Sequence, residues 1–165
     1  MSSAQFDQLM SAYDAVDAAF DAADALPTDE LCQSERLMLL ERREVWRRRL
    51  PAGEHVLLGE LAHAPAEEIG GRAVHVVADR LRIYRRDARR RFEQAIDLGR
   101  RRALSGQPLP PKLEATAAEQ AAGRIGAEQV GIIREFLAHL PCWVDETTRA
   151  EAEATLAQIA ARYRS

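Results

Sequence analysis

The chain has 165 residues, 47% of them hydrophobic, which is enough to bury a core and excludes a protein disordered throughout. Only 5% are aromatic, and Ala and Leu carry most of the apolar content, which favours helices over strands. The net charge of −3 conceals two opposed regions. Residues 1–34 hold seven acids and no base, whereas residues 80–102 hold ten arginines against three acids, a local charge of +7.

The expected location of the protein in the cell follows from features that its sequence lacks. No apolar run approaches the length of a membrane span, and the acidic N-terminus is unlike a signal peptide. Cys32 and Cys142 lie far apart without a CxxC spacing, which argues against a disulfide framework or a cysteine zinc site. We therefore expect a cytoplasmic protein that does not bind membranes and whose two cysteines are reduced packing residues.

Residues 1–50 predict two helices that form a hairpin, or an arm that pairs with another chain. Apolar residues recur at intervals of three and four, as along one helical face. This stripe consists of Phe6, Leu9, Tyr13, Val16 and Phe20. Pro27 ends the first helix, and the second is predicted to begin after Thr28 or Asp29 and to stop at Pro51. The stripe is a candidate surface for a homodimer.

Residues 51–165 predict a helical core. Short helices are expected over residues 53–64, 72–81 and 85–98, and later ones over 116–124, 127–140 and 145–163. Residues 100–115 contain three prolines and are expected to form an extended strap. Because period-2 alternation is absent, we expect no sheet. The fold class is therefore all-α: a multi-helix domain with a helical N-terminal hairpin or arm.

Residues 72–98 resemble a helix-turn-helix. Ala78 is a small residue where two helices would cross closely, and Ala88 and Phe92 would pack the second helix against the first. The usual pattern is not complete, since Tyr84 stands where a Ser or Thr cap is expected and no glycine occupies the turn.

Arginines on the second helix of this segment suggest contact with nucleic acid. A guanidinium donates two hydrogen bonds to one phosphate and stays charged. Arg85 and Arg86 would lie in a first helical turn, where the helix dipole disfavours cations. The proposed phosphate contacts are Arg82, Arg85, Arg86, Arg89 and Arg90, with Arg100, Arg101 and Arg102 flanking them. The alternatives are a solvated or internally paired face, and a protein partner such as the acidic N-terminal helix.

Catalytic motifs are missing from the sequence. It has no glycine-rich phosphate loop, no HExxH and no nucleophile elbow, so we assign no catalytic residue, no cofactor and no small-molecule substrate. A metal site built from His55, Glu60 and His63 is less favoured than ordinary histidines, because their spacing does not place all three on one tight ligand face.

Four segments carry a resemblance to a known family: LPAGEHVLLGELA (50–62), EIGGRAVHVVADRLRI (68–83), a long stretch over 88–130, and IIREFLAHLPCWVDETTRAEAEATLAQIA (132–160). Together they resemble the N-terminal domain, itself of unknown function, of an actinobacterial repeat family that carries a C-terminal HNH endonuclease module. The resemblance implies a DNA-targeting or accessory domain of a nuclease. The HNH motif of such proteins lies downstream of these segments, and none of the four histidines matches it, so the resemblance assigns no catalytic residue.

Overall fold

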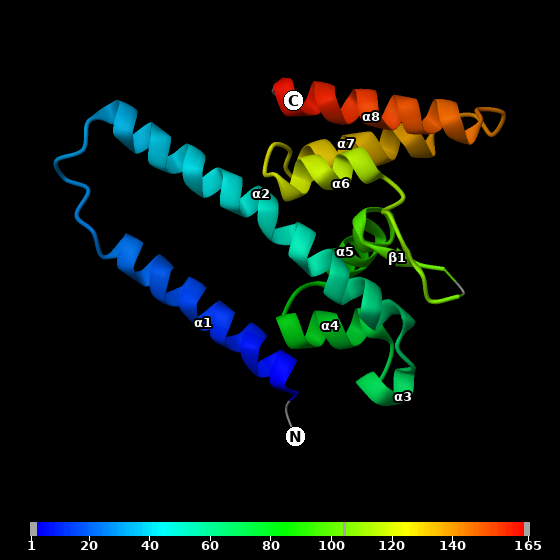
Figure 1. Cartoon of the computed structure of the whole chain (residues 1–165), viewed down its shortest axis with the longest axis horizontal. Helices are drawn as coiled ribbons and strands as arrows, with labels where there is room; N and C mark the ends of the chain where they lie inside the picture. Colours follow the sequence, from blue (N-terminus) through cyan, green and yellow to red (C-terminus); the bar gives the residue numbers. More distant parts are fainter. Residues whose placement is uncertain (1–2, 104, 164–165) are drawn as a thin grey trace. The chain divides into compact units, whose positions relative to one another are not determined.

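The computed structural model describes residues 3–103 and 105–163, and helices dominate it (Figure 1). The all-α fold class is confirmed. The chain divides into two compact units, one up to Glu41 and one from Arg42 onward.

The first unit contains α1 (Ala4–Asp24) and the beginning of α2 (Gln33–His63). Ser3 caps α1, since its side chain accepts a hydrogen bond from the backbone N–H of Phe6 at 3.2 Å. None of the described residues of α1 is buried, and the apolar stripe is 37–59% exposed. The predicted start of the second helix after Thr28 or Asp29 is wrong, because the carbonyls of these two residues accept hydrogen bonds from the Arg36 side chain within a loop.

The predicted break at Pro51 is also wrong, because α2 continues through it to His63. An interior proline removes one backbone hydrogen bond and crowds the preceding turn, at a typical cost of about 3 kcal/mol. Beyond the proline, however, His55 and Leu58 are buried in the second unit. This packing holds the second half of α2 in helical form, and the sequence of the segment alone does not reveal it.

The second unit also contains the remaining elements: α3 (Ala66–Ile69), α4 (Ala73–Leu81), α5 (Arg85–Leu98), β1 (Arg101–Arg102), β2 (Pro108–Leu109), α6 (Glu114–Ala121), α7 (Ala127–Ala138) and α8 (Glu146–Arg162). The predicted helices over 72–81, 85–98, 127–140 and 145–163 are confirmed to within two residues at each end. α6 begins two residues earlier than expected and ends three earlier, and the short helix α3 was not predicted.

The expectation of no sheet is wrong at one place in the strap. β1 and β2 pair antiparallel, with Arg101 opposite Leu109 and Arg102 opposite Pro108. Gly106 adopts φ +82° in the connecting turn, a conformation that favours glycine. Strands of two residues are too short to show period-2 alternation, so no hydrophobic pattern announces them.

Helix α5 contributes to two buried clusters. Near its middle, Phe92 and Ala95 pack with Leu58 of α2 and Val77 of α4. At its end, Leu98 packs into a second cluster with residues that follow the hairpin: Ile125, Val130, Ile133, Leu137 and Ala157. One helix therefore joins the core of α2 and α4 to the core of α7 and α8.

A buried polar contact fixes α2 against α6. His55 Nε2 lies 2.9 Å from Gln120 Oε1, and both side chains are buried. Burial lowers the pKa of His55, so the imidazole is neutral at pH 7. Close by along the chain, Gly123 has φ +77°, and a Cβ atom there would lie 2.8 Å from Val45 Cγ1. Only glycine allows the turn after α6 to approach α2 this closely.

A buried carboxylate from α8 caps the start of α6. Glu153 is 5% exposed and accepts hydrogen bonds from the backbone N–H groups of Thr116, at 2.6 Å, and Ala115, at 3.3 Å, and from the Thr116 hydroxyl. The first N–H groups of a helix have no partner within the helix, so this carboxylate satisfies donors that would otherwise be buried and unpaired.

We expect Glu153→Ala to lower the free energy of unfolding by about 3 kcal/mol, because it leaves several buried donors without an acceptor. Urea denaturation followed by circular dichroism measures this. Glu151→Ala, at an exposed position of the same helix, is the matched control and should change the stability by less than about 0.5 kcal/mol. Equal losses in the two variants would contradict the capping role.

Candidate nucleic-acid interface

Helices α4 and α5 pack as the helix-turn-helix resemblance predicts. Ala78 of α4 is 2% exposed, Ala88 of α5 is fully buried and Phe92 is 5% exposed. The two small residues allow close approach of the helices, and Phe92 anchors α5 beneath α4. Leu81, the last residue of α4, remains 53% exposed.

The turn between these helices is a Schellman motif with an arginine in the glycine position. Arg82 has φ +53°, in the left-handed region. Its backbone N–H bonds to the carbonyl of Asp79, and the N–H of Ile83 bonds to the carbonyl of Ala78 at 3.0 Å. A non-glycine residue in this conformation costs roughly 1–2 kcal/mol. The protein is therefore less stable with arginine at this position than it would be with glycine. Backbone strain of this kind is characteristic of functional positions.

The N-terminus of α5 has no side-chain cap. Tyr84 occupies the cap position, is 88% exposed and makes no capping hydrogen bond with its side chain. The backbone N–H of Asp87 bonds to the carbonyl of Tyr84 at 2.9 Å, whereas those of Arg85 and Arg86 have no partner among the described residues and lie at the positive end of the helix dipole. Such a terminus attracts anions.

Three predicted contact residues surround this helix start and carry uncompensated charge. Arg82, Arg85 and Arg86 are exposed, and none of them forms an ion pair with any residue in 3–103 or 105–163. Asp87, the acid of the first turn, pairs instead with Arg90 and Arg91. The first turn of α5 is therefore a concentration of positive charge on the protein surface.

The two predicted contacts in the second turn of α5 have intramolecular partners. Arg89 Nε lies 3.1 Å from Glu93 Oε1, and Arg90 pairs with Asp87. The pairing alternative therefore holds for the second turn of α5, where acids at i+4 and i−3 are in reach. These pairs are exposed and contribute only about 0–1 kcal/mol each, so an anion can displace them.

The arginine triplet lies at the hairpin and is divided in the same way. Arg102 Nη2 lies 3.4 Å from Glu60 Oε1, and Arg101 donates to the carbonyl of Pro110 at 2.9 Å. Arg100 is exposed and forms no ion pair within the described part of the chain. Among the described residues, Arg102 has an acidic partner, whereas Arg100 and Arg101 resemble the first turn of α5 in having none.

The three residues considered as a metal site, His55, Glu60 and His63, each have another partner in the structure. His55 bonds to Gln120, Glu60 pairs with Arg102, and His63 Nδ1 lies 2.8 Å from the carbonyl of Gly59. Within residues 3–103 and 105–163, no group of three His, Cys, Asp or Glu side chains is arranged to hold a metal ion.

Both cysteines are free and exposed, so the expectation that they pack in the core is wrong. None of the described helices is long and apolar enough to cross a membrane.

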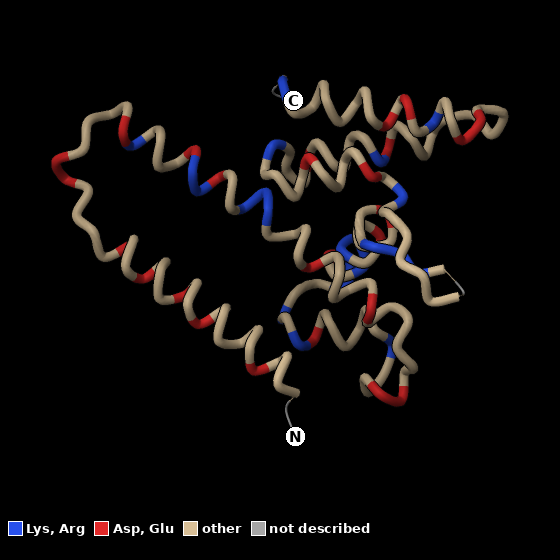
Figure 2. The backbone as a smooth tube through the Cα atoms, in the orientation of Figure 1, with Lys and Arg blue, Asp and Glu red and all other residues tan. Residues whose placement is uncertain are grey.

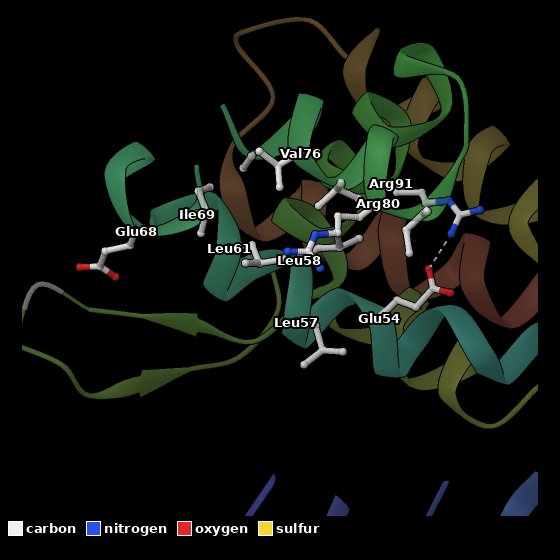
Figure 3. A pocket seen from close by; sticks show the side chains of 12 residues that line it. Glu54, Leu57, Leu58, Leu61, Glu68, Ile69, Val76, Arg80 and Arg91 are labelled. Atoms are coloured by element: carbon white, nitrogen blue, oxygen red, sulfur yellow. Dashed lines mark hydrogen bonds and ion pairs between the residues drawn. The ribbon is translucent and has the colours of Figure 1, made fainter. Parts of the chain in front are cut away.

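A groove that no sequence pattern predicts lies between the second half of α2 and helices α3, α4 and α5 (Figure 3). Its lining includes Leu57, Leu61 and Leu81. The sequence does show more apolar residues in these helices than one core-facing stripe requires. Only the packing shows that several of them line one groove.

This chain belongs to the family described as "Domain of unknown function (DUF222)", whose model matches residues 37–165. It is similar to the Uncharacterized protein Rv1702cMb1728c of Mycobacterium tuberculosis H37Rv, with 45% identity over 99% of this chain and 36% of the relative. The Uncharacterized protein Rv1128c of the same strain is 45% identical over 96% of this chain and 35% of the relative. The Uncharacterized protein Mb1179c of Mycobacterium bovis is 44% identical over 93% and 34%. The chain thus spans about a third of the length of these relatives. No solved structure matches.

We expect Arg82→Gly to raise the free energy of unfolding by about 0.5–1 kcal/mol, because glycine adopts the left-handed conformation without steric cost. Chemical denaturation measures the change. Arg80→Gly, inside the adjacent helix α4, is the control and should be destabilising by about 1 kcal/mol. A loss of stability in Arg82→Gly would show that the turn does not strain the arginine.

Proposed function

We propose that this chain is a non-catalytic, DNA-associated helical domain that contacts backbone phosphates through the first turn of α5. The observation that carries the proposal is the group of Arg82, Arg85 and Arg86, exposed and without ion pairs among the described residues, around an uncapped helix N-terminus. Guanidinium groups and free backbone N–H groups are the donors that phosphates accept from.

The placement of these charges argues against a merely solvated surface. Arginines in the first turn oppose the helix dipole by about 0.3–1 kcal/mol each, and Arg82 adds the strain of its backbone conformation. An anion bound at the turn would reverse the electrostatic part of this cost. Arg89, Arg90 and Arg100 lie further along α5 and at its end, where they extend the basic surface in the direction of the hairpin.

The resemblance to proteins with a C-terminal HNH endonuclease module supports a role for DNA binding by this domain. In that arrangement the present domain would hold DNA while a nuclease module elsewhere in a longer protein cuts it. Phosphate contacts position a protein on a duplex without reading its sequence, which suits a targeting or accessory domain.

The DNA proposal is tested by binding to a 20-base-pair duplex at 50 and 200 mM salt, followed by fluorescence anisotropy. Three phosphate contacts predict that affinity falls about 40-fold over this range, because each contact releases about 0.9 of a counterion. Arg85→Gln/Arg86→Gln should weaken binding and lower the slope of log affinity against log salt by about two.

The matched control is Arg47→Gln/Arg162→Gln, which removes two exposed arginines from α2 and α8 and changes the net charge equally. It should leave the salt slope unchanged. Absence of binding at 50 mM salt, or equal losses in the two double variants, would refute the interface.

A second function, protein interaction or homodimerisation, is favoured by the exposure of the apolar stripe on α1. Its apolar stripe is exposed along its length, and acidic positions mark the helix without any basic one (Figure 2). An amphipathic helix that buries nothing gains little stability, so its stripe is suited to cover by another surface. The acidic flanks favour a basic partner surface, such as the arginine-rich face of another copy.

If the chain forms a dimer through this stripe, Leu9→Glu/Val16→Glu should halve the mass measured by light scattering, because it places charges in the apolar contact. Ser11→Glu/Ala18→Glu adds the same charges on the opposite face of α1 and should leave the mass unchanged. A wild-type chain that is monomeric at all concentrations would exclude the homodimer.

A further inference from the structure

The groove beside α4 has the size and lining of a small-molecule site. Its cavity volume is about 490 Å³, within the range typical of ligand pockets. Seven of its lining residues are large aliphatic side chains from α2, α3 and α4: Leu57, Leu58, Leu61, Ile69, Val76, Val77 and Leu81. All of them belong to the second unit, so the groove is formed within one compact body.

The charged residues of the groove leave one cation uncompensated. Glu54 Oε2 and Arg91 Nη1 lie 3.2 Å apart, so this acid and this base are already paired. Figure 3 shows the carboxylate of Glu68 directed away from the other lining residues. Arg80 has no ion pair among the described residues, and it lines the same groove as Leu58 and Leu61.

We infer that this groove binds an amphipathic small-molecule anion, in which an apolar chain lies on the leucines and a carboxylate pairs with Arg80. A charge-assisted hydrogen bond between a guanidinium and a carboxylate is stronger than one between neutral groups, so Arg80 in the lining favours a carboxylate as the polar end of the ligand. The apolar walls account for affinity, and the single unpaired cation selects an anion over a neutral or cationic molecule of equal length.

A single cation favours a small molecule over an acidic helix of a partner. A helix docked in a groove is recognised by anchors spread over two or more turns, and its flanking acids need several separate cations. Here the other arginine of the groove, Arg91, is occupied by Glu54 and by Asp87. This inference is independent of DNA binding, since Arg80 is not among the proposed phosphate contacts.

The test measures binding of decanoate to the full chain by isothermal titration calorimetry, beside decan-1-ol and decyltrimethylammonium. Decanoate should bind at least tenfold more tightly than the other two. Arg80→Gln should reduce decanoate affinity about tenfold, to the level of the alcohol, because it removes one charge-assisted pair. Arg162→Gln, which removes an exposed arginine from α8, should leave the affinity unchanged.

A second variant reports on the apolar walls. Leu57 is 59% exposed, so Leu57→Asn should fold normally, as circular dichroism and thermal melting can establish. It shortens an apolar wall without adding a charge, so it should weaken the binding of all three ligands. The inference is overturned if decanoate does not bind, if it binds no better than the alcohol, or if Arg80→Gln and Arg162→Gln bind it equally.

Discussion

The second unit depends on the packing of α5. Its buried face begins at Ala88, passes through Phe92 and Ala95 and ends at Leu98. Phe92 and Ala95 belong to one buried cluster and Leu98 to the other, and the two clusters have no buried residue in common. Residues at intervals of three and four lie on one side of a helix, which leaves the opposite side to solvent. Arg86, Arg89 and Arg90 are exposed on that other side, whereas Arg91 is partly buried and lines the groove. The core contact therefore determines both the position of the helix and the direction in which its charges face.

The same packing explains the division among those charges. Acids of α2 lie within reach of α5 and the hairpin, and they pair with Arg91 and Arg102. The first turn projects beyond these acids, so Arg82, Arg85 and Arg86 keep their charge uncompensated among the described residues. Arg80, one turn earlier on α4, lines the groove instead. Arginines close together in sequence thus lie on two different surfaces.

Prediction from the sequence succeeded where local patterns were strong. The helix expected over residues 85–98 corresponds to α5, and the helix expected over 145–163 corresponds to α8, which Asp145 caps by accepting from the N–H of Thr148 at 2.9 Å. It failed at Pro51, where the local preference to end a helix is outweighed by the burial of His55 and Leu58. It also failed at the hairpin, whose two-residue strands carry no periodicity.

The sequence by itself determined the helical fold class, the crossing of α4 and α5 at small residues, and the concentration of arginine between Arg80 and Arg102. These depend on short-range periodicity and on composition, which are local properties of the chain. Only the tertiary structure decided which arginines are paired, that Arg82 adopts a left-handed conformation, and that leucines of α2 and α4 line a groove. Each of these depends on atoms far apart in sequence, whose distances are fixed by core packing.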